Sequence, residues 1–265
     1  MMQKIESVKN EQIKKINKLK QKKYRQQAGK YLLEGWHVIK EALINRPQEV
    51  EIILTVSDHL AVLRPYLRDH SWIVLEINDR VAEVLSDTVH TDGIFAVAKL
   101  PEFSETTLLN HESKPWLVLD QVQDPGNAGT MVRTADAAGF AGVIFSAGAI
   151  DPFNSKVVRS MQGSQFHLIV AQVHDLKAFL EIQRQQDYQI FGTLVDSSAT
   201  DIRQIALANQ RYVLMMGNEA HGLSTELAAL ADDNLYLPIF GQAESLNVAI
   251  AAAVLMYQLQ MQVDL

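Results

Sequence analysis

The sequence predicts an α/β protein in two parts, a small N-terminal α/β domain and a larger C-terminal domain built on a parallel sheet. A chain of 265 residues with 48% hydrophobic content is long enough to bury two modest cores. Short apolar segments of strand type alternate with helical segments along most of the chain. The polar stretch from residue 100 to Pro115 has no clear period and suits a linker. We therefore place the domain boundary near residue 108, which gives domains at 1–107 and 108–265.

The first domain is expected to open with a basic helical segment. Residues 10–27 carry Ile13, Ile16, Leu19 and Tyr24 among lysines, which is a sparse helical stripe. The elements expected after it are a strand at 31–35, a helix at 36–43, a strand at 50–56, a helix at 60–68, and strands at 72–77 and 93–98. Together they make a small α/β unit of about 100 residues.

The second domain shows strands and helices in regular alternation. The expected strands are 116–120, 142–145, 166–170, 189–194, 212–216 and 234–238, and the expected helices are 128–138, 156–161, 176–186, 225–231 and 246–262. Short apolar strands that alternate with helices indicate a parallel sheet covered on both faces. Ligands of such sheets bind beyond the carboxyl ends of the strands, so functional residues are expected in the loops there.

Composition excludes several classes of protein. Without cysteine, the chain has no disulfide, no thiolate nucleophile and no cysteine-based zinc site. The eight histidines are scattered singly, so no metal is expected. The sequence shows no apolar run long enough for a membrane span and no signal peptide, which predicts a cytoplasmic protein without membrane association. Dinucleotide-binding, P-loop, serine-hydrolase and zinc-protease motifs are absent from the sequence.

The charge of the chain is distributed unevenly. Residues 1–40 hold 11 of the 24 basic and 3 of the 31 acidic residues, a net charge of +8, against −15 for the rest. A basic arm on an acidic body is typical of a protein that confines its phosphate contacts to one face. A solvated helix that only keeps the protein in solution would have the same composition, and charge alone leaves the two interpretations open.

The first segment with chemical character follows the strand expected at 116–120. An Asp-Pro-Gly-Asn turn leads into a helix that Asn127 is placed to cap and Gly139 to end. Arg133 lies on the helix face that turns back toward the strand ends. From these residues alone, a functional arginine and an ordinary salt-bridging arginine remain equally open.

Two further segments follow strands near the end of the chain. The loop from Gly217 to Gly222 has glycines that permit close backbone approach to a ligand, and its Glu219 is either a solvated charge or a partner for a cation such as Arg133. In the segment 237–248, Ser245 and Asn247 are both of the type that caps a helix start. The helix that follows them is apolar nearly all round, so we expect it to be buried against the sheet, a second subunit, or both.

Taken in order, these segments resemble the three motifs of the SpoU (TrmH-like) RNA methyltransferases over roughly residues 115–260. The N-terminal part is similar to that family's accessory substrate-binding domain. The segment 151–164 also resembles the family, although Met161 stands where a small hydroxyl residue is common. The matching residues are Asn127-x5-Arg133, Gly217-Asn218-Glu219-x2-Gly222-Leu223 and Pro238-x6-Ser245-Leu246-Asn247-Val248 in the C-terminal part, and Lys22-Lys23-x-Arg25 and Tyr31-Leu32-Leu33-Glu34-Gly35 in the N-terminal part.

The resemblance implies a C-terminal domain tied in a trefoil knot, an exception to the rule that chains avoid threading. It also implies S-adenosylmethionine as the cofactor and transfer of its methyl group to a ribose 2′-oxygen of RNA. Much of the rate of such a displacement can come from holding the two reactants in line. The cofactor would lie among three loops, at Thr193, Leu194, Gly217, Asn218, Leu237, Ile239, Ser245 and Leu246.

The same resemblance places Arg133 at the 2′-hydroxyl group. Because an arginine side chain is always protonated, orientation and charge stabilisation suit Arg133 better than proton abstraction. Asn127 and Glu219 would position Arg133, while Ser245 and Asn247 would shape the pocket for the cofactor and the target ribose. The resemblance further implies a homodimer, and RNA contacts from Lys22, Lys23, Arg25, Lys156 and Arg159.

Ribosomal RNA is favoured over transfer RNA as the substrate, because the N-terminal domain resembles that of rRNA-modifying relatives. The main alternative is a catalytically inactive RNA-binding protein of the same fold that acts in ribosome assembly. A doubly wound nucleotide or sugar enzyme is a weaker alternative, since the phosphate loop and the dinucleotide fingerprint are missing.

Overall fold

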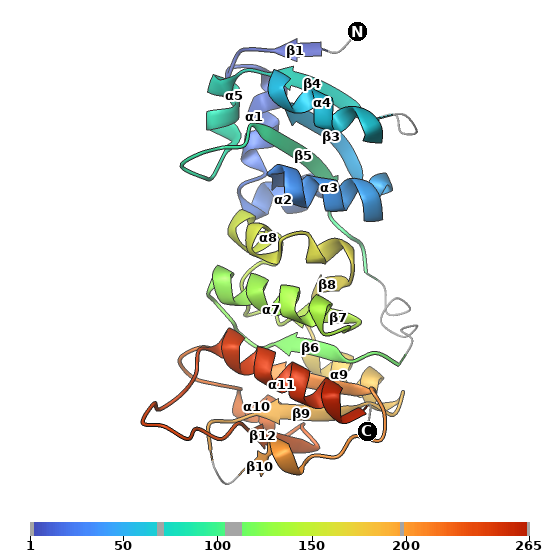
Figure 1. The fold of residues 1–265 in the computed structure, drawn as a ribbon, viewed down its shortest axis with the longest axis vertical. Helices are drawn as coiled ribbons and strands as arrows, with labels where there is room; N and C mark the ends of the chain where they lie inside the picture. The colour runs from blue at the N-terminus through green and yellow to red at the C-terminus, as the bar shows by residue number, and fades with distance from the viewer. Residues whose placement is uncertain (1–2, 68–71, 104–112, 197–198, 264–265) are drawn as a thin grey trace. The chain divides into compact units, whose positions relative to one another are not determined.

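The computed structural model describes residues 3–67, 72–103, 113–196 and 199–263, which form two compact units (Figure 1). Unit 1 comprises Met1–Glu102 together with Phe153–Phe166, and unit 2 comprises Phe103–Pro152 together with His167–Leu265. The boundary expected near residue 108 lies outside the described residues. The segment 153–166 therefore packs with unit 1, although it lies in the middle of the C-terminal part of the sequence.

Unit 1 is built on a five-stranded mixed sheet with the strand order β1-β4-β3-β5-β2. Strands β1, β4 and β3 are parallel, and β5 runs antiparallel to β3 and to β2. The strands are β1 Gln3–Ile5, β2 Lys30–Glu34, β3 Val50–Thr55, β4 Ile73–Ile77 and β5 Ile94–Lys99. The helices are α1 Glu11–Lys18, α2 Lys22–Ala28, α3 Trp36–Asn45, α4 Leu60–Leu63, α5 Asp79–Leu85 and α8 Ser155–Met161.

Strand alternation gives unit 1 a core on each face of its sheet. Ile53 of β3 packs in one buried cluster and its neighbour Leu54 packs in the other, because successive side chains of a strand point to opposite faces. The first cluster also holds Val158 of α8, and Phe153 meets Tyr31 edge-on with ring centroids 5.0 Å apart. These contacts account for the inclusion of segment 153–166 in unit 1.

The basic N-terminal segment differs from the sequence expectation. It forms two helices instead of one continuous helical segment. Helix α1 ends at Lys18, with its C-cap at Leu19, and α2 begins at Lys22. The guanidinium of Arg25 donates from Nη1 to the carbonyl oxygens of Leu19 and Lys20, at 2.9 and 2.8 Å, and so satisfies the backbone of the break. Strand β1 and helix α5 were not expected either. Strand β1 has three residues, too few for a periodic signal, whereas Asn78 does cap α5 in the usual way.

Unit 2 is built on a seven-stranded sheet in which every strand pairing is parallel, with the order β10-β12-β9-β11-β6-β7-β8. This confirms the parallel-sheet α/β architecture that the alternation of elements predicts. The strands are β6 Trp116–Leu119, β7 Gly142–Phe145, β8 Ile169–Gln172, β9 Gln189–Thr193, β10 Thr200–Asp201, β11 Tyr212–Met216 and β12 Asp233–Tyr236. The helices are α7 Pro125–Ala137, α9 Leu176–Arg184, α10 Thr225–Ala228 and α11 Val248–Val263.

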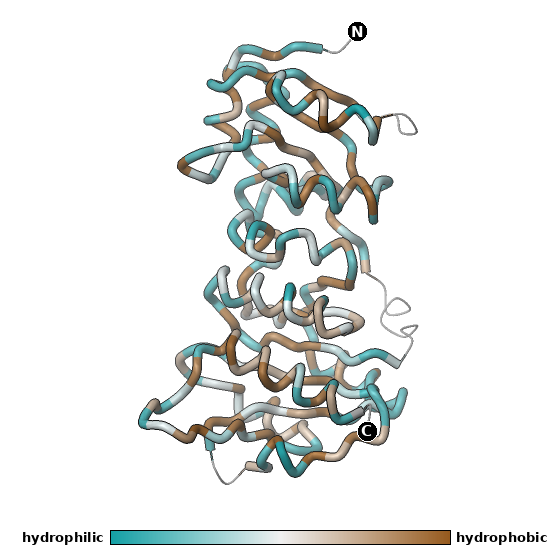
Figure 2. The backbone as a smooth tube through the Cα atoms, in the orientation of Figure 1, coloured by the Kyte–Doolittle hydropathy of each residue, from teal (hydrophilic) through white to brown (hydrophobic). Residues whose placement is uncertain are grey.

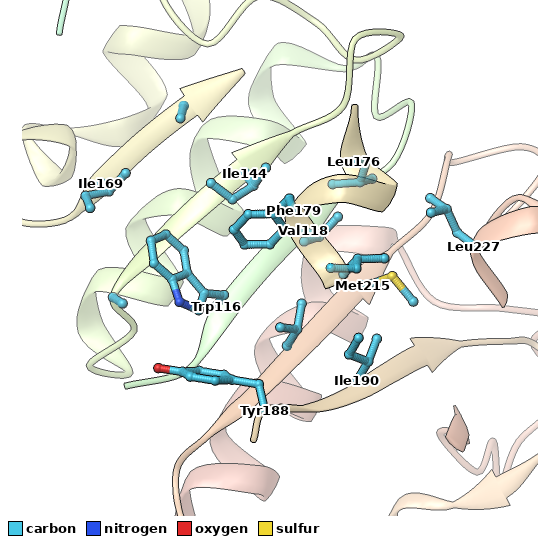
Figure 3. Packing of buried hydrophobic residues seen from close by; sticks show 14 of the residues in the cluster. Trp116, Val118, Ile144, Ile169, Leu176, Phe179, Tyr188, Ile190, Met215 and Leu227 are labelled. Carbon is cyan, nitrogen blue, oxygen red and sulfur yellow. The ribbon is translucent and has the colours of Figure 1, made fainter. Parts of the chain in front are cut away.

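One core cluster of unit 2 lies under α9 (Figure 3). Its largest side chain is Trp116, which is fully buried and meets Phe179 edge-on at 5.6 Å between ring centroids. Gly142 permits this packing, because a Cβ there would lie 2.6 Å from both the Trp116 ring and the Ile169 carbonyl oxygen. Hydrophobic residues colour much of the central strands (Figure 2), as expected for a sheet buried on both faces.

Within the described ranges, no helix is both long and apolar enough to cross a membrane.

Candidate functional site

A cavity of about 460 Å³ lies beyond the carboxyl ends of β9, β11 and β12 in unit 2, where ligands of parallel sheets bind. Three loops and the start of α11 form its walls. The volume falls within the range of about 300–1,000 Å³ that small-molecule sites occupy. The lining includes all eight residues at which the sequence predicts cofactor contacts, namely Thr193, Leu194, Gly217, Asn218, Leu237, Ile239, Ser245 and Leu246.

The loop after β11 closes tightly on itself. The backbone N–H groups of Asn218 and Gly222 donate to each other's carbonyl oxygens, each at 2.9 Å. Gly217 must be glycine, because a Cβ there would lie 2.0 Å from the Leu223 nitrogen and 2.1 Å from the Gly222 carbonyl carbon. The amide oxygen of Asn218 also accepts from the Ala220 and His221 N–H groups, at 2.9 and 3.2 Å. The loop can therefore present backbone to a ligand without rearranging.

Glu219 holds the beginning of α7 against this loop. Its carboxylate accepts hydrogen bonds from the backbone N–H groups of Gln123 at 3.2 Å and Asp124 at 3.0 Å, and from the Asn127 side-chain amide at 3.2 Å. Desolvation alone would raise the pKa of Glu219, but the backbone donors and the Asn127 amide hold that pKa below its ordinary value. The carboxylate therefore serves as a charged acceptor that joins two loops.

Asn127 continues this network to the third segment. Its amide oxygen accepts from the Asn247 amide nitrogen at 3.0 Å. The amide oxygen of Asn247 in turn accepts from the N–H groups of Ala249 and Ile250 in the first turn of α11, at 2.9 and 3.3 Å. Through Glu219, Asn127 and Asn247, the three motif segments share one hydrogen-bond network.

Two of the expected helix caps are wrong. Asp124, and not Asn127, caps α7, since its Oδ1 accepts from the Asn127 N–H at 2.8 Å and Pro125 occupies the first helical position. This leaves the Asn127 side chain available for Glu219 and Asn247. At α11 only Asn247 accepts first-turn N–H groups, whereas Ser245 lines the cavity.

Arg133 is exposed on α7. Among the described residues it has no hydrogen-bond or ion-pair partner in the chain. Asn127 and Glu219, which the resemblance expects to position Arg133, bond instead to each other and to the backbone. A single chain thus leaves the guanidinium available to an external group.

The sequence interpretation missed three residues around the cavity. Asp120 at the end of β6 is 4% exposed, and its carboxylate accepts from the Ser224 N–H at 3.2 Å, which holds the far end of the β11 loop. Its signal was a carboxylate directly after a buried strand. His221 and Glu244 also lie in the cavity wall. Each is a single polar residue in a loop, which by itself is no signal of a site.

The five residues expected to contact RNA all belong to unit 1. Lys22 and Lys23 are exposed on α2, and Lys156 is exposed on α8. Arg159 is partly exposed and lies 3.7 Å from the Glu34 carboxylate. Arg25 is only 3% exposed and serves the backbone at the α1–α2 break.

The Glu219 contacts lead to a stability prediction. We expect Glu219→Gln to lower the Tm at neutral pH, because a glutamine amide cannot accept all three donors. A carboxyl whose pKa is lower in the folded than in the unfolded state contributes stability above its unfolded pKa of about 4.3, and loses it as the pH falls through the folded pKa. The Tm difference from wild type should therefore be full at pH 7 and should shrink as the pH falls below about 4.3 and through the lowered pKa of the folded protein. Glu181→Gln, an exposed carboxylate on α9, should show no such trend, and a difference that is independent of pH would contradict the assignment.

Comparisons with known proteins agree with the arrangement of the site. The model of the SpoU rRNA methylase family matches residues 114–257, more than half of the chain. This chain belongs to the SpoU family. The MRM3-like substrate-binding domain matches residues 10–96 of this SpoU protein, within unit 1.

Full-length relatives and solved structures give the same result for this SpoU protein. It is 37% identical to the 23S rRNA (guanosine(2553)-2'-O)-methyltransferase RlmP of Bacillus subtilis. The alignment covers 98% of this chain and 100% of RlmP. The AdoMet-bound rRNA methyltransferase from Sinorhizobium meliloti matches with a TM-score of 0.86 at 29% identity, covering 98% of both chains. The SpoU methyltransferase AviRb from Streptomyces viridochromogenes, solved with AdoMet, matches with a TM-score of 0.85 at 26% identity, covering 96% of this chain and 98% of AviRb.

The protein is therefore an S-adenosylmethionine-dependent RNA 2′-O-methyltransferase. The cavity of unit 2 suits such a cofactor. Gly217 allows the β11 loop to close tightly at the cavity wall, where a Cβ would clash with the loop backbone, and Leu237, Ile239 and Leu246 add apolar walls. Within the part of the chain that the structure describes, no group of three or more His, Cys, Asp or Glu side chains is arranged to hold a metal ion.

Proposed function

We propose that this enzyme methylates a ribose 2′-hydroxyl group of ribosomal RNA, in the large-subunit RNA, and acts in the cytoplasm where bacterial ribosomes are made. The observation that carries the proposal is the cavity at the strand ends, formed by three loops. The Glu219–Asn127–Asn247 network joins two of these loops, those after β11 and after β12, to the start of α7. The Bacillus subtilis relative, which this chain matches from end to end, is a 23S rRNA methyltransferase, and this supports 23S rRNA as the substrate.

The test is methylation of ribosomal RNA by the purified protein. Ribosomal RNA from cells that lack the gene is incubated with methyl-labelled S-adenosylmethionine, and the product is mapped by mass spectrometry of nuclease fragments. We expect one labelled nucleotide, in the large-subunit RNA, whose 3′ linkage resists alkali. A label on a base, or in transfer RNA alone, would contradict the proposal. RNA binding with no S-adenosylmethionine binding would favour the inactive assembly factor, which the methyltransferase names of the relatives do not favour.

The proposed division of labour follows the geometry. When bound, S-adenosylmethionine supplies an electrophilic methyl group on its sulfonium. Leu194, Gly217, Leu237 and Ile239 hold the cofactor by apolar contact and close backbone approach. Ser245 and Asn247 shape the pocket toward the ribose. In-line placement of the two reactants lowers the barrier more than any proton transfer that these residues could provide.

Arg133 is proposed to bind the RNA next to the reacting hydroxyl. An arginine guanidinium binds two oxygens at once, so Arg133 can orient the nucleotide through a phosphate and stabilise developing negative charge on the 2′-oxygen. Asn127 and Glu219 act on the loops of the cavity, by the hydrogen bonds described above, instead of acting on Arg133.

We propose that the enzyme is a homodimer that uses α11. Four apolar side chains at helical spacing form an exposed stripe along this helix, and a stripe of this kind on a soluble domain marks a protein interface. Their exposed fractions are 54% for Ile250, 43% for Val254, 41% for Tyr257 and 63% for Met261.

We also propose that the chain of unit 2 is threaded as the trefoil knot of the family, with α11 returning onto α7 and β11.

The dimer proposal predicts the effect of a charge in this stripe. Ile250→Asp should shift the protein from dimer to monomer in sedimentation at micromolar concentration, because the aspartate would have to be desolvated in the interface. Ile44→Asp is the matched control, since Ile44 is 51% exposed on α3 of unit 1. A wild-type protein that sediments as a monomer, or an Ile250→Asp variant that remains dimeric, would contradict the use of α11.

We propose that Lys22, Lys23 and Lys156 contact RNA phosphates, while Arg25 serves the structure of unit 1. The double variant Lys22→Glu/Lys23→Glu should weaken RNA binding at least tenfold and flatten the dependence of log K on log salt, because fewer counterions are released. Fluorescence anisotropy with labelled rRNA fragments measures both effects. Lys177→Glu, on α9 of unit 2, is the control, and an equal loss in that variant would show a general charge effect.

A further inference from the structure

Unit 1 has a recess of its own, formed by residues that the cofactor cavity does not use. Its volume is about 210 Å³, and it lies where the end of β2, the start of α3, the loop at residues 86–93 and helix α8 meet. Most of its lining residues have polar side chains: Glu34, His37, Thr88, His90, Asp92, Arg159 and Gln162.

The wall of the recess is organised around Glu34. Its carboxylate accepts from the Ser86 and Thr88 hydroxyls and from the Asp87 N–H, the last two at 3.0 and 3.2 Å, and lies 3.7 Å from the Arg159 guanidinium. These contacts bind the loop at 86–93 and helix α8 to the end of β2. The recess is therefore built before any ligand arrives.

The charges of the recess do not favour an anion. Two carboxylates, of Glu34 and Asp92, face one guanidinium, which is already paired with Glu34. A phosphate would meet more negative than positive charge there. The lining supplies hydrogen-bond donors and acceptors from His37, His90 and Thr88, which suits a neutral planar group with a polar edge.

The size of the recess sets a further limit. At about 210 Å³ it has room for one heterocyclic base and not for a stretch of nucleotides. Sequence-specific RNA recognition uses unpaired bases, which stack on planar side chains such as histidine and bond through their edges. His37 and His90 are both exposed, so their rings are accessible to such a base.

We propose that this recess binds one unpaired base of the RNA substrate, as a recognition contact separate from the cofactor cavity. The proposal rests on RNA being the substrate, as the proposed function has it. It assigns unit 1 a base-reading role in addition to the phosphate contacts of its lysines. The recess and the cavity of unit 2 share no lining residue, and we take the recognised nucleotide to be different from the methylated one.

The test couples base deletion in RNA to side-chain deletion in the recess. A series of rRNA fragments, each with one abasic nucleotide at an unpaired position, is measured with wild type and with His37→Ala/His90→Ala. For wild type we expect one position, other than the methylated one, at which base removal raises KM about tenfold with kcat unchanged, in line with the loss of one stacked base. The double variant should show the same rise in KM with the intact RNA, and removal of the base should then raise KM no further.

Controls separate this contact from folding and from the proposed function. His59→Ala, a partly exposed histidine of unit 1, should behave as wild type, and S-adenosylmethionine affinity should stay within twofold in every variant. The proposal would be overturned if base removal and the double substitution raised KM additively, or if the double variant had the KM of wild type. Failure to methylate any RNA would overturn the proposed function alone, because the same coupling can be measured as RNA binding by anisotropy.

Discussion

Replacing Gly217 with alanine is expected to abolish measurable S-adenosylmethionine binding, with a loss of affinity of at least ~100-fold, or about 2.7 kcal/mol. The physical reason is steric. A Cβ at this position would lie 2.0 Å from the Leu223 nitrogen and 2.3 Å from the Gly222 carbonyl oxygen, which are backbone atoms that no rotamer change can move. The loop would have to open, and with it the paired hydrogen bonds between Asn218 and Gly222.

The measurement is calorimetric titration of S-adenosylmethionine into Gly217→Ala, together with a thermal melt of the free protein. Gly241→Ala is the matched control, because Gly241 lies in another loop of the same site and a Cβ there meets no atom within 4 Å. We expect Gly241→Ala to bind within about twofold of wild type, on the scale of 1.4 kcal/mol per tenfold. Wild-type affinity in a folded Gly217→Ala protein would show that the cofactor does not use this loop.

Replacing Arg133 with alanine is expected to lower kcat by ~10²–10³ while leaving the Tm unchanged. The activity loss follows from removing a fixed positive charge next to developing negative charge, an effect of this order in other enzymes. Stability should not change, because the side chain is exposed and pairs with none of the other described residues of the chain. Arg133→Lys should recover only part of the rate, since an ammonium lacks the planar fork that binds two oxygens at once.

Single-turnover methylation of an rRNA fragment at saturating cofactor measures the chemical step directly. Arg80→Ala, which removes an exposed arginine on α5 of unit 1, controls for a general loss of positive charge. The pH profile distinguishes the two possible roles of Arg133. Charge stabilisation predicts a parallel profile at a lower rate, whereas a changed profile would indicate that Arg133 takes part in proton transfer.

The sequence alone determined the local properties of this protein. Apolar periodicity predicts the parallel strands of unit 2, and glycine at 217 and 139 marks positions that only glycine suits, the latter with φ of +76° at the end of α7. Periodicity and glycine positions of this kind depend on neighbours a few residues away. The resemblance of three motif segments to the SpoU family implied eight cofactor residues, and all eight line one cavity.

Only the tertiary structure decided which polar groups meet. Asn127 reads as a helix cap in the sequence, yet its amide bonds to Glu219 and Asn247, which lie 92 and 120 residues away, because Asp124 already caps the helix. The packing of α8 with unit 1 likewise depends on Val158 joining its buried cluster and on Phe153 meeting Tyr31 of β2, 122 residues earlier in the chain. Hydrogen bonds and packing at such separations depend on how the chain folds in space, which a local pattern of residue types does not specify.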